Sequence, residues 1–173
     1  CETQGKEIGA CWHEVGTSAV GLAQYLDTNT YIQTQVLLSV HAPAQVGVSR
    51  TQDGSALTRV VRAAAPVVGL PRGAFSEVDG VATADALFAG ESAAARRAVG
   101  ERYLCAAALQ ALATLCARAG RPLRPGAVYA RLHPLQTKVT IDVGTARDLE
   151  LVRNARDGGR AGTLLGAVDR TVT

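Results

Sequence analysis

The sequence predicts an α/β layer over residues 1–90 followed by an all-α part over residues 91–173. In the first part, short β-branched runs typical of strands alternate with runs whose apolar residues recur at helical spacing. In the second part, Ala and Leu dominate and apolar residues lie three or four positions apart. The charge also changes sign near Gly90, from five Lys and Arg against eight Asp and Glu to thirteen against seven. We therefore expect two domains that meet at residue 90.

The first ninety residues begin with a predicted β-hairpin. Residues 8–13 and 19–27 have strand character, and residues 14–17 form the turn between them. A helix is expected over 32–40, because Thr28-Asn29-Thr30 offers an N-cap and Pro43 stops the helix. The rest of this part is predicted to hold a strand at 45–49, a helix at 55–65, a strand at 67–68 and a helix at 82–88. This order of elements is typical of an open α/β layer.

The second part is predicted to begin with one long helix over 91–119, which Gly120 and Pro122 terminate. A helix of this length is typical of a bundle or a lever and unusual in a small catalytic domain. Further along, the pattern indicates an extended segment at 139–142, a short helix at 146–153 capped by Thr145, a turn at 157–159 and a helical turn over 163–168.

No pattern in the sequence predicts catalysis, a cofactor or a metal ion. There is no phosphate-binding loop of the G-x-x-x-x-G-K-[ST] type, and the four cysteines form no C-x-x-C pair, so we expect free thiols. A two-metal nuclease needs converging carboxylates, but the first predicted strand carries no acid and Asp27 stands alone at the end of the second. His13, Ser18 and Asp27 can be imagined as a triad, but no nucleophile elbow surrounds Ser18. Trp12 is expected in a core or an interface, because no second aromatic residue alternates with it.

Six arginines of the second part form its densest basic run, and they are the candidate contacts for a DNA backbone. These residues are Arg96, Arg97, Arg118, Arg121, Arg124 and Arg131. Phosphate contact is one interpretation, and it predicts an affinity for DNA that falls steeply with salt. The other interpretation is a solvated helix face with pairs four residues apart, such as Arg97 and Glu101.

Two segments near the end of the chain carry a family pattern. Residues 140–151 read TIDVGTARDLEL, and residues 162–173 read GTLLGAVDRTVT. In order and spacing the two resemble consecutive motifs of the core domain of MutS proteins, with Asp148 in place of the usual Asn. The resemblance assigns a structural role to the motif residues Asp142, Thr145, Asp148, Leu149, Glu150, Leu151, Asp169 and Thr171.

The resemblance to MutS proteins extends over nearly the whole chain and implies a domain assignment. Residues 1–90 are similar to the connector domain, which has an RNase H-like fold without its catalytic acids. Residues 91–173 are similar to the first part of the core and lever domain, here truncated. Within the family, the resemblance favours the meiotic MutS homologue four, and it rests on residues 26–31, Ala42-Pro43 and residues 102–107. Phe75-Ser76-Glu77 spells the Phe-x-Glu wedge of mismatch repair, but it lies too late in the connector, and we interpret it as a chance match.

The resemblance therefore implies a fragment of an ATPase that binds Holliday junctions and other branched or double-stranded DNA as a sliding clamp. Its expected partner is MutS homologue five. The protein is expected to act on meiotic chromosomes in the nucleus, where it would promote crossovers. The full-length protein would need ATP and Mg, whereas this part would link domains and relay nucleotide state without chemistry or cofactors of its own. No membrane contact is expected. A fragment of a mismatch-repair MutS protein and a stand-alone α/β enzyme remain alternatives.

Overall fold

A computed structural model of the chain describes residues 6–133, 141 and 143–168. Its central sheet begins with an antiparallel hairpin of β1 (Lys6–His13) and β2 (Ala19–Asp27), paired from Lys6 opposite Asp27 to His13 opposite Val20. The turn closes where the Thr17 amide donates to the Glu14 carbonyl at 3.0 Å. The hairpin predicted from the sequence is confirmed. A third strand, β5 (Tyr129–Leu132), runs parallel to β2, so the order is β1-β2-β5.

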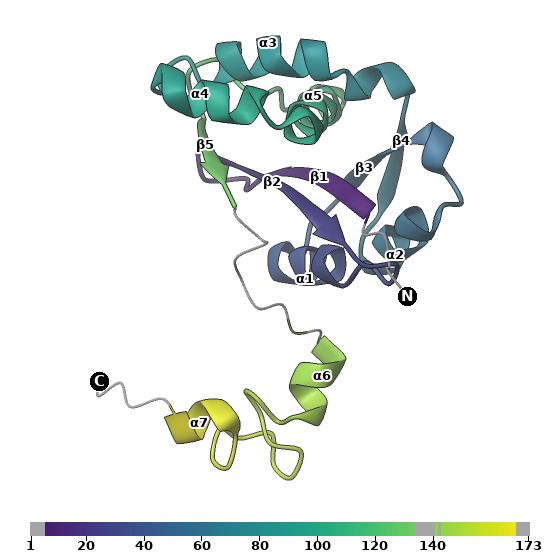
Figure 1. Cartoon of the computed structure of the whole chain (residues 1–173), viewed down its shortest axis with the longest axis vertical. Coiled ribbons are helices and arrows are strands. Elements are labelled where there is room, and N and C mark those ends of the chain that lie inside the picture. Colours follow the sequence, from purple (N-terminus) through teal and green to yellow (C-terminus); the bar gives the residue numbers. More distant parts are fainter. Residues whose placement is uncertain (1–5, 134–140, 142, 169–173) are drawn as a thin grey trace.

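One face of this sheet carries the main core. Alternation along the strands turns Val20 and Leu22 of β2 towards this face, together with Leu132 of β5. Three helices cover it, namely α3 (Glu77–Leu87), α4 (Ala93–Gly100) and α5 (Tyr103–Arg118), as Figure 1 shows above the sheet. Phe88 and Leu109 fill the space between sheet and helices and are fully buried.

The opposite face is partly covered by α1 (Ile32–His41), which begins with a cap that the sequence did not predict. Thr28-Asn29-Thr30 does not supply the N-cap. Instead the Asp27 carboxylate, 2% exposed, accepts the amides of Thr28 at 2.8 Å, Gln33 at 3.2 Å and Thr34 at 2.9 Å, and the Thr34 hydroxyl at 2.7 Å. The last strand residue thus satisfies free N–H groups at the start of the next helix.

A second, two-stranded parallel sheet joins β3 (Val46–Ser49) to β4 (Val67–Leu70). A short 3₁₀ turn η1 (Arg50–Gln52) and helix α2 (Ala56–Ala64) connect the two strands, and a second turn, η2 (Arg72–Phe75), follows β4. These elements confirm the predicted strand–helix–strand order.

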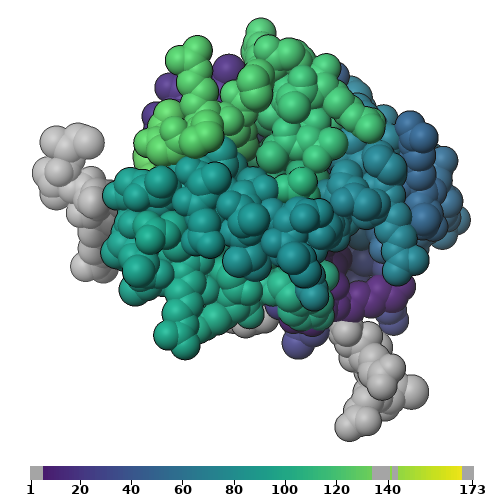
Figure 2. All heavy atoms as spheres, turned by 90° about the horizontal axis from the view of Figure 1, so that it is seen from above, coloured from purple at the N-terminus to yellow at the C-terminus, as the bar shows by residue number. Residues whose placement is uncertain are grey.

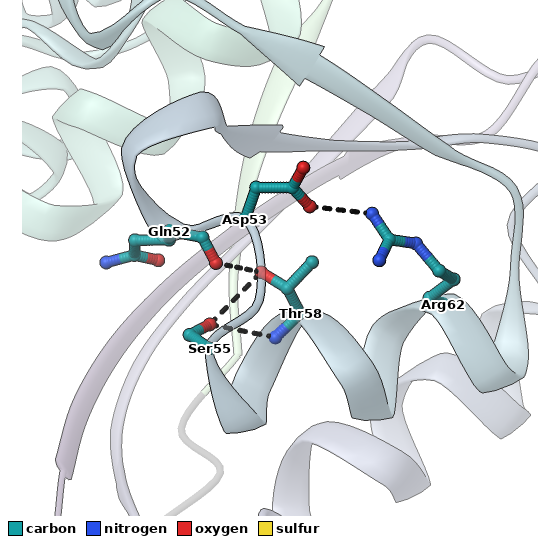
Figure 3. Close-up of polar contacts among 5 residues, drawn as sticks. All are labelled: Gln52, Asp53, Ser55, Thr58 and Arg62. Carbon is teal, nitrogen blue, oxygen red and sulfur yellow. Dashed lines mark hydrogen bonds and ion pairs between the residues drawn. The ribbon is translucent and has the colours of Figure 1, made fainter.

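Figure 3 shows how α2 begins. The Ser55 hydroxyl accepts the Thr58 amide at 3.1 Å, and the fully buried Thr58 hydroxyl donates to the Gln52 carbonyl at 2.8 Å. Asp53 and Arg62 form an exposed ion pair at 2.7 Å beside this cap. The start of α2 is therefore encoded locally by a Ser N-cap, at the residue where the sequence predicted the helix to begin.

The single long helix predicted over 91–119 is wrong. The chain forms two helices, α4 and α5, with a break at Glu101 and Arg102, where Arg102 has φ −105° and ψ 85°. Contacts with the hairpin set the start of α5: the Tyr103 hydroxyl donates to the Glu7 carboxylate at 2.7 Å, and the Leu104 amide donates to the Gln24 side chain at 3.1 Å. These partners lie far away in sequence, so no local sequence pattern predicts the break between the two helices.

Packing continues through residue 90, where the sequence predicted a boundary. Val99 and Cys105 belong to the same buried cluster as Val20 and Leu22. Gly80 of α3 lies directly against the backbone of Ala106 in α5. The net charge of the surface therefore changes near residue 90, but the buried core continues across this position as far as β5.

Two short helices, α6 (Val143–Asp148) and α7 (Leu164–Val168), follow the α/β body and lie outside it in Figure 1. The turn predicted at 157–159 is present, with Gly158 at φ 71°, and the helical turn predicted over 163–168 is confirmed as α7. The extended segment predicted at 139–142 lies outside the described residues except for Ile141. Within the described part of the chain, no helix is long and apolar enough to span a membrane.

Candidate nucleic-acid interface

The six candidate arginines fall into three groups in the structure. Arg96 and Arg97 lie on α4. Arg118 ends α5, and Arg121 and Arg124 follow it in the loop that leads to β5. Arg131 lies on β5 itself. The structure therefore does not bring all six together, and each group has its own surroundings.

The two arginines of α4 are engaged with neighbouring groups. Arg97 pairs with Glu101 four residues later at 2.9 Å, in an exposed ion pair of the kind that the sequence predicted. Arg96 donates to the Glu91 carbonyl and lies 3.6 Å from the Asp85 carboxylate. Exposed pairs of this kind contribute little to stability, but they neutralise both guanidinium groups. These two arginines are weak candidates for phosphate contact.

Arg118, Arg121 and Arg124 are exposed and have no ion pair within the described residues. No Asp or Glu occurs between Glu101 and Asp142, so this stretch of chain is uniformly basic. Such a surface attracts phosphate through unbalanced positive charge.

The loop that carries these arginines is anchored. Gly120, with φ 70°, ends α5 in the left-handed conformation, and the Arg121 amide donates back to the Cys116 carbonyl at 2.9 Å. The Gly126 amide then donates to the Leu87 carbonyl at 3.0 Å, which ties the loop to the end of α3. Figure 2 shows this green segment on the surface beside the teal helices α3 and α4.

Arg131 faces away from this surface. It pairs with Gly21 of β2, which in turn pairs with Trp12 of β1, and residues paired across strands point to the same side of a sheet. That side is opposite to the core face of Val20 and Leu22, which α5 covers. The basic run of the sequence is thus divided between the two sides of the sheet.

The two motif segments near the end of the chain lie in contact. The Leu164 amide donates to the Glu150 carbonyl at 3.3 Å, and the Leu165 amide donates to the Leu151 carbonyl at 3.0 Å. The Glu150 carboxylate accepts the Ala155 amide at 2.8 Å, although Glu150 itself has a positive φ of 48°. Residues predicted to be structural are therefore used to join α6 to α7.

Some motif residues depart from the prediction or cannot be placed. Thr145 does not cap a helix over 146–153, because α6 already begins at Val143 and ends at Asp148. The cap at α7 comes from Thr163, whose buried hydroxyl accepts the Gly166 amide at 2.9 Å. Asp148 and Leu149 are exposed at the end of α6. Asp142, Asp169 and Thr171 lie outside the described residues.

No protein-family model matches the chain. A stretch of 35 residues, 20% of this chain, is 60% identical to the DNA mismatch repair protein MutS of Symbiobacterium thermophilum. The chain contains a MutS-like segment. The match covers 4% of the length of the bacterial protein. The similarity is therefore confined to a short segment, and most of the bacterial protein is not matched by this chain.

The geometry does not support the catalytic arrangements that the sequence analysis considered. Asp27 and His13 lie at opposite ends of the hairpin, and the Asp27 carboxylate is occupied by the start of α1. Burial raises the pKa of Cys11 well above its ordinary value and that of Cys105 to about 11, so neither thiol is an available nucleophile near neutral pH. Among the described residues, no group of three His, Cys, Asp or Glu side chains could hold a metal ion.

One cluster went unnoticed in the sequence. Trp12 was expected in a core or an interface, and its ring centroid lies 4.5 Å from that of His41 and 4.8 Å from that of His133. The three residues come from β1, the end of α1 and the residue after β5, so their spacing in the chain gives no signal. Only the fold brings the rings together.

Proposed function

We propose that this chain is a non-catalytic linking part of a MutS-type DNA-repair or recombination ATPase. The observation that carries the proposal is the 35-residue stretch with 60% identity to a bacterial MutS protein. The contact between the two motif segments supports it, because family-motif residues with a structural role should hold local elements together. In this proposal ATP and Mg act elsewhere in the full-length protein. The α/β body, which includes residues 1–90 and continues to β5, acts as an RNase H-like connector without catalytic acids.

A linking part must transmit a displacement from one neighbour to another without deforming. The α/β body suits this task, because α5 packs on β1 and on α3 and also contacts β3 and η2 of the second sheet. Its core is continuous from the hairpin to β5. A force applied at either sheet would therefore move the body as one unit.

We further propose that the parent protein belongs to the meiotic branch of the family. It would pair with MutS homologue five in the nucleus and form a sliding clamp on Holliday junctions that promotes crossovers. Residues 26–31 and 102–107 are the sequence support for this branch. The matched relative is named as a mismatch-repair protein, so a mismatch-repair parent is the competing function.

Co-purification of the full-length protein separates these two functions. The meiotic assignment predicts a stable complex with MutS homologue five, together with ATP-dependent retention on DNA that holds a Holliday junction. A mismatch-repair parent would instead bind duplexes with a single mispair more tightly than matched duplexes. Mispair preference without a complex with homologue five would overturn the meiotic branch, and an absence of ATPase activity in the full-length protein would overturn the MutS assignment itself.

The exposed arginines give a prediction for the chain alone. Changing Arg118, Arg121 and Arg124 together to Gln should weaken binding to a duplex oligonucleotide, because each phosphate contact releases counterions. The slope of log affinity against log salt should become shallower by about 2.7, at about 0.9 for each lost contact. Titrations at several salt concentrations, followed by fluorescence anisotropy of a labelled duplex, provide the measurement.

A charge-matched control makes this test specific. Changing Arg59, Arg62 and Arg72 to Gln removes the same charge from other parts of the α/β body. This control should leave the salt slope near that of the unmodified chain. Equal loss in both triple variants would show that only net charge matters, and an unchanged slope in the first variant would remove these arginines as a DNA contact.

A further inference from the structure

The aromatic cluster lies on the sheet face opposite to the main core. Trp12 touches His41 and His133, and the two imidazole centroids lie 6.4 Å apart at nearly a right angle. Gly21 lies under the indole, and a Cβ at that position would overlap the Trp12 ring. The missing side chain of Gly21 therefore lets the indole lie flat across β2 towards β5.

Strand β5 extends the same face with two exposed side chains. Tyr129 and Arg131 alternate with the inward-facing Ala130 and Leu132, so both point to the side of the indole. Tyr129 is 43% exposed. Helix α1 covers this face from Asp27 as far as its last residue, His41, and packs mainly on β2 and α2. Beyond the end of α1, the described residues on this face include the rings of Trp12, His133 and Tyr129 and the guanidinium group of Arg131.

Several donors on this face have no partner within the described residues. Three groups make no hydrogen bond to any described residue: the indole N–H of Trp12, the hydroxyl of Tyr129 and the guanidinium of Arg131. The carboxylate in contact with the cluster is that of Glu14, and it lies 3.6 Å from Nδ1 of His41. The patch thus offers flat rings and hydrogen-bond donors, and it suits a ligand with planar rings, acceptors and negative charge.

We propose that Trp12, Tyr129 and Arg131 form a binding site for single-stranded nucleic acid, with unpaired bases stacked on the rings and a phosphate held by Arg131. Aromatic side chains on an open sheet face are a general solution for stacking unpaired bases. Duplex DNA keeps its bases stacked on one another and cannot present their planes to this surface. The site deepens the proposed role in DNA repair or recombination, yet it lies on the other side of the sheet from Arg118.

Trp12 is the sole tryptophan of the chain and reports directly on this site. Titration of the whole chain with a single-stranded oligothymidylate at low salt should quench its fluorescence, because a stacked base lies on or beside the indole. A duplex of equal length and an abasic strand of equal length are the comparison probes. Each should cause much less quenching, since neither offers an unpaired base.

Exposed positions allow variants that leave the core intact. Tyr129→Ala should weaken binding of the single strand about tenfold or more, given the strength of base–aromatic stacking. Arg131→Gln should make the salt dependence shallower by about 0.7, the value for one phosphate contact on a single strand. The control is Val78→Ala, another truncation of an exposed side chain, since Val78 is 74% exposed and lies on α3 over the opposite face. That control should bind the single strand like the unmodified chain.

The outcomes separate this site from the proposed function. An unchanged Trp12 emission with oligothymidylate would overturn the site, as would equal quenching by the abasic strand or an affinity insensitive to Tyr129→Ala. The triple Gln variant at Arg118, Arg121 and Arg124 should retain the quenching. If quenching persists while the full-length protein lacks ATPase activity, the site stands and the MutS assignment falls.

Discussion

Replacing Gly80 with Ala should lower the free energy of unfolding by about 2 kcal/mol, and Gly80→Val should lower it further. A Cβ at Gly80 would overlap the backbone carbonyl of Ala106, and backbone atoms cannot turn aside as a flexible side chain can. Helix α3 would have to move off α5. Loosening of this contact would spread through the core, because Leu87 and Leu109 of these two helices belong to the same cluster. Urea denaturation followed by circular dichroism gives the measurement.

The same substitution at Gly100 provides the matched control and should have the opposite sign. Gly100 ends α4, and the nearest atoms to an added Cβ are the methyl groups of Val81 at 3.8 Å, an ordinary contact. Alanine there should stabilise the chain by about 0.5–1 kcal/mol, because Ala loses less backbone entropy than Gly in a helix. Equal effects at Gly80 and Gly100 would refute the close approach of α3 and α5.

Replacing Asp27 with Ala should lower the free energy of unfolding by about 3 kcal/mol. The change removes the acceptor for the amides of Gln33 and Thr34 and for the Thr34 hydroxyl, and the Thr34 groups are buried. Donors left without a partner in a buried site cost more than the hydrogen bonds contribute in net terms. The start of α1 should fray first, so amide exchange at Gln33 and Thr34 should accelerate before the rest of the chain unfolds.

Asp53→Ala serves as the control for the Asp27 variant. Asp53 is exposed and forms an ion pair with Arg62 at 2.7 Å, and such pairs contribute at most about 1 kcal/mol. Its loss should change stability by less than a third of the Asp27 effect. A mild effect of Asp27→Ala, similar to that of Asp53→Ala, would show that α1 does not depend on the carboxylate cap.

The arginines illustrate the limits of a composition-based prediction. The sequence identifies six basic residues in one run, but it cannot tell which of them are paired. Arg97 finds Glu101 within its own helix, which spacing does predict, whereas Arg96 finds Asp85 across the contact of α3 and α4. The alternation of β5 sends Arg131 to the opposite side of the sheet from α5. Only Arg118, Arg121 and Arg124 remain as one candidate contact for duplex DNA.

The sequence by itself determined the features whose causes are local. The β1–β2 hairpin, the start of α2 at Ser55, the end of α5 at Gly120 and the turn of α7 each follow from residues a few positions apart. Alternation, hydroxyl N-caps and a left-handed glycine act over such distances, so the printed chain is enough to predict them. The two segments that resemble MutS motifs are equally local, and a 35-residue stretch of the chain is similar to a bacterial MutS protein.

Only the tertiary structure decided features that depend on residues distant in the chain. The break between α4 and α5 follows from contacts of Tyr103 and Leu104 with Glu7 and Gln24. Strand β5 exists because it pairs with β2, more than a hundred residues earlier. The ring cluster of Trp12 forms for the same reason, since β5 delivers His133 to it. These features depend on pairing between residues that are distant in the chain. Local sequence preferences do not determine which distant strand or ring will be the partner.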